Sequence, residues 1–183
     1  MITNKQEYLY YLSEDQRALN YSGKKRPRFF SDEIWKFERL LRKTEYHLNV
    51  HGSHSIRYII SKAQFKYMSM RLSFSIPLNV FGPGLSIGHY GTIVVNGKAS
   101  VGANCRIQTD TLIGGGGYGK VGYPVIGDNC YIGTGAKIFG NITIGNNVKI
   151  GANAVVNKSF GSNVTIAGIP ARVVKKNNEE LMR

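Results

Sequence analysis

The feature that most constrains this chain is a six-residue repeat in its second half. Aliphatic side chains recur at every sixth position in two series, 95–113 and 126–156, which a longer step separates. Glycine often follows the aliphatic residue, and asparagine, aspartate or glycine often stands two positions later, where a left-handed backbone is tolerated. One short strand and one sharp corner therefore alternate, and three such units would close a triangular coil.

The repeat predicts which side chains face the core and which residues form the corners. Cys105 and Cys130 lie two positions before a ladder residue, where small side chains pack, so we expect buried free thiols and no acyl-carrying cysteine. The predicted core positions are Val95, Val101, Ile107, Ile113, Ile126, Ile132, Ile138, Ile144, Ile150 and Val156. The predicted left-handed corner positions are Asn104, Asp110, Asn129, Gly135, Asn141, Asn147 and Asn153.

Residues 1–75 carry helical periodicity instead. Ser13 followed by Gln16 forms a capping-box pattern, and Ser31 followed by two acids marks a second helix start. A third run, 55–72, spaces its apolar residues as an amphipathic helix does. We therefore expect a helical region over 1–75, a repeat domain over 76–174 and a basic C-terminal tail over 175–183.

The chain is strongly basic, with 24 Lys and Arg against 11 Asp and Glu and a formal net charge of +13. This balance favours an anionic partner: nucleic acid, a membrane surface or a phosphate-bearing cofactor. The basic stretch SGKKRPRF, 22–29, is interpreted as a solvated loop, with contact to an anion or a membrane surface as the alternative. No apolar run approaches the ~20 residues of a membrane span, and no secretory signal opens the chain. We expect a cytoplasmic protein; contact with a membrane stays open as an alternative, although the sequence does not indicate it.

Two departures from the repeat suggest function. The segment GGGGYGKVGYPV, 114–125, makes the ladder step thirteen residues where two repeats would take twelve. Its glycines either bare backbone N–H groups to a ligand or form a loop that bulges from the coil. His89 stands six positions before Val95, which places it in a ladder slot one coil from Ile107. Because a neutral imidazole can accept a proton from an alcohol, His89 is the predicted general base; a buried structural histidine is the alternative.

The strings IGHYGTIVVN, IGGGG and AGIPARVVKK, together with the repeat, resemble the hexapeptide-repeat acyltransferases, most closely the serine acetyltransferase branch and its relatives in polysaccharide biosynthesis. The resemblance implies a mainly β left-handed parallel β-helix, a homotrimer, acetyl-CoA as co-substrate, no metal, and direct transfer with His89 as the base. Asp110 is a candidate to orient His89, or only a corner residue. The candidate cofactor-binding residues are Gly115 and Gly116, which also offer N–H groups to an oxyanion, with Thr134, Ala152, Lys149, Lys158 and Lys176.

The acceptor is predicted from departures from that family. Serine acetyltransferases have an aspartate before the catalytic histidine and a second histidine at the end of the glycine segment, where this chain has Gly88 and Tyr123. We therefore expect a sugar hydroxyl of a capsular, exo- or lipopolysaccharide precursor as acceptor, with Tyr90 and Tyr123 contacting it. The alternatives are L-serine as acceptor and, from another class, a non-catalytic trimeric scaffold.

Other chemistries fit the sequence less well. His47, His51 and His54 are spaced like metal ligands, but no cysteine lies near them, and the segment reads as a joint between helices. The lysines of the repeat domain are scattered and accompany no nucleic-acid motif. We therefore expect neither a metal nor a nucleic-acid partner.

Overall fold

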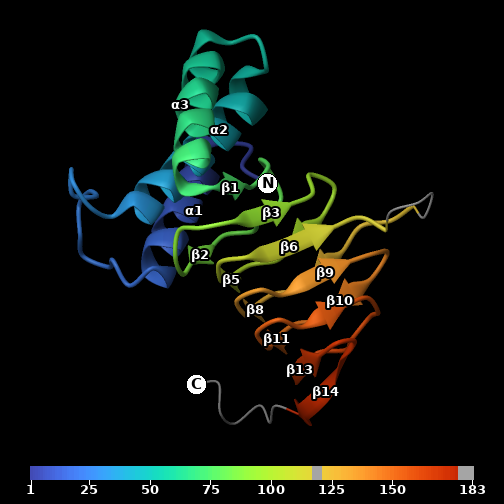
Figure 1. Ribbon diagram of the computed structural model, residues 1–183. Coiled ribbons are helices and arrows are strands. Elements are labelled where there is room, and N and C mark those ends of the chain that lie inside the picture. The colour runs from blue at the N-terminus through green and yellow to red at the C-terminus, as the bar shows by residue number, and fades with distance from the viewer. Residues whose placement is uncertain (117–120, 177–183) are drawn as a thin grey trace.

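The computed structural model describes residues 1–116 and 121–176, and shows a layer of helices on one end of a column of strands (Figure 1). The helices are α1 Lys5–Ala18, α2 Glu33–His51 and α3 Ile56–Leu72. The strands are β1 Phe74–Ser75, β2 Ser86–Ile87, β3 Ile93–Val95, β4 Ser100–Val101, β5 Arg106–Ile107, β6 Thr111–Gly114, β7 Val125–Ile126, β8 Tyr131–Ile132, β9 Lys137–Phe139, β10 Thr143–Ile144, β11 Lys149–Ile150, β12 Val155–Val156, β13 Val164–Gly168 and β14 Ala171–Lys176.

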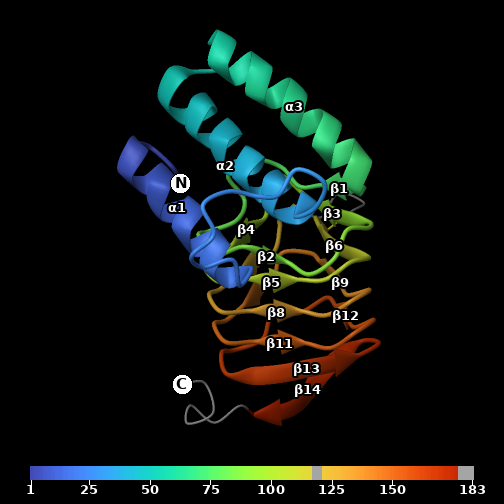
Figure 2. The ribbon, with the colours of Figure 1, turned by 90° about the vertical axis from the view of Figure 1, so that its left-hand side faces the viewer.

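The described strands form three sheets that are the faces of the column. We call them face A (β1, β3, β6, β9, β12), face B (β4, β7, β10) and face C (β2, β5, β8, β11, β13), and within each face neighbouring strands are parallel. The chain moves from one face to the next at every corner, so each coil lies beneath the one before (Figure 2). Strand β14 adds to face C in the antiparallel direction and ends the column. The fold is the left-handed parallel β-helix: the repeat predicts its triangular coils, and the resemblance to the hexapeptide-repeat acyltransferases implies its left-handed winding.

The inside of the column is filled by the aliphatic ladder. All ten predicted core positions are buried, and none is more than 4% exposed. Their partners in register are other ladder residues, as where Ile107 pairs with Ile132 and Ile132 with Ile150. Cys105 and Cys130 are buried free thiols, and burial raises the pKa of the Cys105 thiol, which suits packing and not nucleophilic chemistry.

The corners follow the predicted chemistry with one exception. Six of the seven predicted positions have positive φ, from 55° at Asn104 to 76° at Gly135. Asn141 is the exception, because Gly140, with φ of 105°, makes the turn there. Stacked asparagines also bond between coils, as where the Asn104 amide donates to Asn129 Oδ1 at 3.1 Å.

The helices begin at residues other than those the capping patterns indicate. Helix α1 begins at Lys5, where the Asn4 side chain accepts the Glu7 N–H at 2.9 Å, so Ser13 lies inside the helix, and its hydroxyl bonds the Tyr10 carbonyl. The prediction of a start at Ser13 is therefore wrong, because a hydroxyl can bond backward to a carbonyl within a helix. Likewise Asp32, not Ser31, caps α2.

Candidate active site

His89 lies at a widened corner between face C and face A. Ile87, and not His89, pairs with Ile107, while Val95 pairs with Ile113. Eight positions therefore separate the ladder residues 87 and 95, where the repeat has six. The prediction that His89 fills a ladder slot is wrong: two extra residues lift it out of the ladder, and its side chain is exposed to solvent. Tyr90 beside it is 71% exposed.

The coils below continue this corner with other predicted residues. Thr134 and Ala152 occupy it in successive coils, and the Asn153 N–H donates to the Thr134 carbonyl at 2.8 Å. Asp110 also belongs to this corner, with φ of 58°, and its carboxylate accepts from Lys137 Nζ at 3.0 Å. No hydrogen bond joins Asp110 to His89 among the residues that the structure describes. Asp110 therefore fills the corner role, with Lys137 as its ion-pair partner.

Gly88, the residue before His89, lies against the amide of Gln108 in the next coil. A Cβ at Gly88 would come within 2.2 Å of Gln108 Oε1. Gln108 is only 8% exposed, and its side chain occupies the space beside Gly88. Sequence reasoning found the missing side chain at position 88 and missed the amide beside it, because the two residues are brought together only by the stacking of coils.

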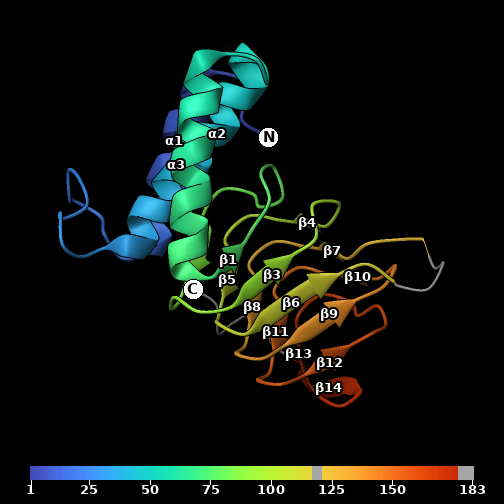
Figure 3. The same cartoon turned by 45° about the horizontal axis from the view of Figure 1, so that its top comes forward.

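The glycine segment lies at a different corner, between face A and face B. Ile113 and Ile126 are consecutive ladder residues, so the step of thirteen replaces one repeat of six and adds seven residues to the coil. The segment is therefore an insertion at this corner, and not two further repeats with one added residue. The described ends of the segment project beyond the column (Figure 3), while residues 117–120 lie outside the described residues.

A hollow of about 540 Å³ opens beneath the glycine segment. It is lined by Gly116, Val121, Phe139, Gly140, Asn141, Ile142 and Asn157. Tyr123 packs on the backbone nearby, since a Cβ at Gly115 would meet Tyr123 Cε1 at 2.9 Å. Lys98 Nζ lies 5.3 Å from the centre of the Tyr123 ring. Tyr123 therefore supports the glycine backbone from one side.

The predicted cofactor lysines do not gather at one place in a single chain. Lys158 follows Asn157 at the corner of the glycine segment, and its Nζ lies 5.5 Å from the Phe160 ring centre. Lys149 projects outward from strand β11 on face C, and Lys176 ends strand β14. His89 and the glycine segment likewise belong to different corners of the same column.

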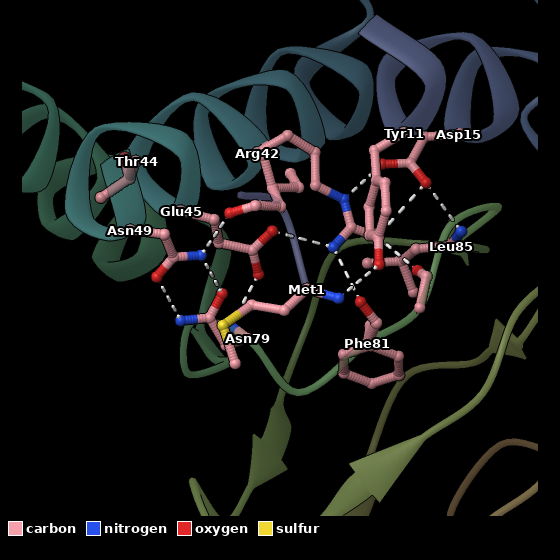
Figure 4. A network of polar contacts seen from close by, with 12 residues as sticks. Met1, Tyr11, Asp15, Arg42, Thr44, Glu45, Asn49, Asn79, Phe81 and Leu85 are labelled. Carbon is pink, nitrogen blue, oxygen red and sulfur yellow. Dashed lines mark hydrogen bonds and ion pairs between the residues drawn. The ribbon is translucent and has the colours of Figure 1, made fainter. Parts of the chain in front are cut away.

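A buried charged network above the first coil is the largest feature that sequence reasoning missed. Arg42 of α2 is fully buried and bonds Asp15 of α1 at 2.7 Å and Glu45 at 3.0 Å (Figure 4). Its guanidinium also donates to the carbonyls of Phe81 at 2.9 Å and Gly82 at 2.7 Å. Burial opposes the charge, but the two carboxylates raise the Arg42 pKa above its usual range.

The same helices hold the strand that leads to His89. Asp15 Oδ1 accepts the N–H groups of Gly84 at 2.8 Å and Leu85 at 2.9 Å. Glu38 Oε1 accepts the Ile87 N–H at 3.0 Å, two residues before His89. In an amphipathic helical pattern these charged residues appear only as polar positions. The sequence therefore gives no sign that they are buried and do not belong to a solvent-exposed helix face.

Other candidate groups remain apart from this corner. Among the described residues, no cluster of three or more His, Cys, Asp or Glu side chains could hold a metal ion, and the rings of His47 and His51 lie 5.7 Å apart on α2. Within the same residues, no helix has the length and apolar character to cross a membrane.

Comparison with known proteins identifies the repeat. Residues 123–158 match the model of the bacterial transferase hexapeptide family (six repeats). A serine acetyltransferase from Staphylococcus xylosus is 38% identical over 141 residues, which are 70% of this chain and 64% of that protein. The structure of serine acetyltransferase from Brucella abortus strain S19 in complex with coenzyme A superposes with a TM-score of 0.75 at 28% identity, covering 95% of this chain and 70% of the other. Soybean serine acetyltransferase complexed with serine gives 0.71 at 26% identity, covering 93% and 70%.

These relatives correct the predicted acceptor and set the extent of the likeness. The homologues and the structural neighbours are serine acetyltransferases, so the interpretation as a polysaccharide O-acetyltransferase is wrong, and the polar groups missing at positions 88 and 123 do not indicate a sugar. The chain spans 45% and 38% of the length of two other curated serine acetyltransferases, from Buchnera aphidicola and Synechococcus elongatus. Residues 123–158 thus carry the repeat of the bacterial hexapeptide transferases, and most of the chain is similar in sequence and fold to serine acetyltransferases.

Proposed function

We propose that this protein is an acetyl-CoA-dependent O-acetyltransferase that acetylates the hydroxyl of L-serine. The observation that carries the proposal is the exposed imidazole of His89, set on a corner with two extra residues in a chain homologous to serine acetyltransferases. Two such enzymes have been solved with coenzyme A and with serine. The assignment of the acceptor therefore rests on the similarity of the whole chain to these enzymes and on no single residue.

In the proposed reaction, His89 accepts the proton of the serine hydroxyl while that oxygen attacks the thioester carbon of acetyl-CoA. The carbon–sulfur bond then breaks, and the imidazolium returns the proton to the departing thiolate, so that O-acetylserine and free CoA leave. Backbone N–H groups at Gly115 and Gly116 are the proposed donors to the oxyanion that forms between these steps. Asp110 is bonded to Lys137 and takes no part in this proposal.

The active site is proposed to form between subunits of a homotrimer. In one chain, His89 belongs to the corner between faces C and A, and the glycine segment belongs to the corner between faces A and B. In a trimer, the glycine-segment corner of one subunit can lie against the His89 corner of its neighbour. The hollow beneath Gly116 then suits part of the CoA arm, with Lys158 beside it for a phosphate and Thr134 and Ala152 along the facing corner. Tyr90 is exposed beside His89 and is proposed to contact the acceptor.

The test follows thiol release from acetyl-CoA with and without L-serine. We expect serine-dependent release, and we expect His89→Ala to lower kcat by about 10²–10⁴-fold with unchanged thermal stability, because the side chain is exposed and supports no packing. Thr92→Ser, at an exposed position of the same corner to which no role is assigned, is the matched control and should retain the activity. Equal rates for His89→Ala and the parent chain, or release of the CoA thiol that does not depend on L-serine, would contradict the proposal.

A second measurement addresses the shared site. Gly115→Val places a side chain against Tyr123 and is expected to disable the glycine segment. Coexpression of His89→Ala subunits with Gly115→Val subunits should restore part of the activity, because a mixed trimer contains interfaces with both corners intact. Activity that stays absent in mixed trimers would place the whole site within one subunit.

A further inference from the structure

The loop between α1 and α2 carries an exposed pair of aromatic side chains. Phe29 is 83% exposed and Phe30 is 93% exposed, and their ring centres lie 4.8 Å apart in an edge-to-face arrangement. The loop stands out from the helical layer, away from the column of strands (Figures 1 and 3). Two adjacent phenylalanines so exposed are costly in water, because each leaves a large apolar surface unburied.

The loop is held in place by polar bonds at its base. The amide of Gln16 donates to the carbonyls of Tyr21 at 2.9 Å and Lys24 at 2.7 Å. At the other end, Asp32 accepts from the Arg28 side chain at 2.9 Å, and Lys36 Nζ donates to the Phe29 carbonyl at 2.6 Å. The aromatic pair is therefore presented by a braced loop.

Basic side chains surround the pair. Residues 22–30 contain Lys24, Lys25, Arg26 and Arg28 and no acid. Arg28 is bonded to Asp32, whereas Lys24, Lys25 and Arg26 form no salt bridge among the described residues. A hollow of about 650 Å³ lies under the loop, lined by Arg26, Pro27, Arg28, Phe29 and Lys36. The loop thus joins apolar tips to a positively charged base.

From this combination we infer that residues 22–30 form a binding site for an anionic lipid bilayer, with Phe29 and Phe30 entering the interface and Lys24, Lys25 and Arg26 contacting lipid phosphates. A bilayer of acidic lipids offers an apolar layer beneath negative charge, and both features of the loop find a complement in it. The same loop of a second copy is a poorer occupant, since residues 22–30 carry four basic side chains and no acid, and two such loops would repel. Residues 22–30 are separate from the proposed active site, so this inference does not rest on the proposed function.

The test is sedimentation of the full chain with vesicles of phosphatidylcholine, alone or mixed with phosphatidylglycerol. We expect binding to the mixed vesicles only, and we expect it to weaken with salt. Replacing Lys24, Lys25 and Arg26 with glutamine should weaken binding on the order of 100-fold, since each basic residue near such a surface contributes about a factor of five. Phe29→Ser with Phe30→Ser should weaken it by about tenfold or more.

Helix α3 supplies matched controls. Ile59→Ser with Ile60→Ser removes an exposed apolar pair, 52% and 53% exposed, and Lys62→Gln with Lys66→Gln removes exposed charge. Both double variants should bind the mixed vesicles as the parent chain does. Losses equal to those of the loop variants would overturn the assignment to the loop.

A spectroscopic arm reports insertion directly. The chain has one tryptophan, Trp35, which is fully buried and gives a constant background. In Phe30→Trp, emission should shift to the blue when mixed vesicles are added, and free glycerol phosphate should neither cause the shift nor displace the protein. If glycerol phosphate displaced the protein from the vesicles, the loop would be a binding site for free phosphates, and the lipid-bilayer proposal would be overturned. Binding to duplex DNA that survives the serine substitutions, without vesicle binding, would make the surface a nucleic-acid site and overturn the proposal.

Discussion

The first coil and the later coils have similar strands but satisfy their backbone groups differently. In the later coils each strand bonds the strand of the next coil, as where the Arg106 N–H donates to the Cys130 carbonyl at 2.9 Å. In the first coil the upper side has no such neighbour along much of its length, and charged side chains from α1 and α2 take that place. Backbone pairing thus maintains the column, and ionic side chains end it.

This difference has an energetic consequence. Neighbouring coils are joined by hydrogen bonds between neutral backbone N–H and C=O groups, and each bond contributes about 1 kcal/mol net to stability. The top of the first coil instead depends on Arg42 and two carboxylates taken out of water, an arrangement that is costly to break because removal of one partner leaves the others uncompensated. Substitutions in the two regions should therefore differ in size and in their dependence on pH.

The largest effect is expected for Arg42→Met. The change leaves Asp15 and Glu45 buried without their cation and the Phe81 carbonyl without its donor, so the free energy of unfolding should fall by about 3–5 kcal/mol. Urea unfolding monitored by circular dichroism measures it. Lys43→Met, the same change at the exposed neighbouring position, should cost little, and similar losses for both would mean that the network contributes no special stability.

A smaller effect is expected at a corner of the later coils. Asn129 has φ of 56° and accepts from Asn104, so Asn129→Ala should lower the free energy of unfolding by about 1–2 kcal/mol through a strained left-handed backbone. Asn129→Gly removes the same amide bond but accepts the backbone conformation, so it separates the two contributions. A glycine variant as unstable as the alanine variant would assign the loss to the asparagine bond.

The smallest effect concerns pH at the top of the first coil. Burial, with Asp15 nearby, raises the pKa of the Glu38 carboxyl. A raised folded-state pKa gives stability that is fully present below the unfolded value, near 4.5, and is lost as pH rises through the folded value. Glu38→Gln cannot ionise and still offers an oxygen to the Ile87 N–H, so its melting temperature relative to the parent chain should rise between pH 4 and pH 8. A constant difference across that range would contradict a protonated Glu38.

The sequence predicted the column well and its irregular corners poorly. Ladder positions such as Ile132 are buried because a six-residue period leaves them no other place in a triangular coil. His89 was misplaced because the register of a coil depends on which strand it bonds, and two residues added at a corner leave the local pattern intact. The sequence also left open how much of the glycine segment is an insertion, since thirteen positions fit two repeats nearly as well as one repeat with seven added residues.

The candidate site could therefore be predicted only in part from the sequence. The residue type of His89 suggested its chemistry, but its exposure and the amide of Gln108 beside Gly88 depend on the coil below. Arg42, Asp15 and Glu38 meet across two helices and a strand far apart in the sequence, and no spacing of residues indicates such a meeting. The acceptor prediction failed because it relied on two positions, Gly88 in place of an aspartate and Tyr123 in place of a histidine, whereas the similarity to serine acetyltransferases spans most of the chain.

Nothing within a repeat limits the number of coils, and the unpaired strand edges at the end of a column can bond the strands of another molecule. Here the carboxyl groups of Asp15 and Glu38 accept hydrogen bonds from N–H groups of the first coil, and Arg42 donates to two of its carbonyls. The helices thus set the length of the solenoid and deny its upper end to stacking by a second chain.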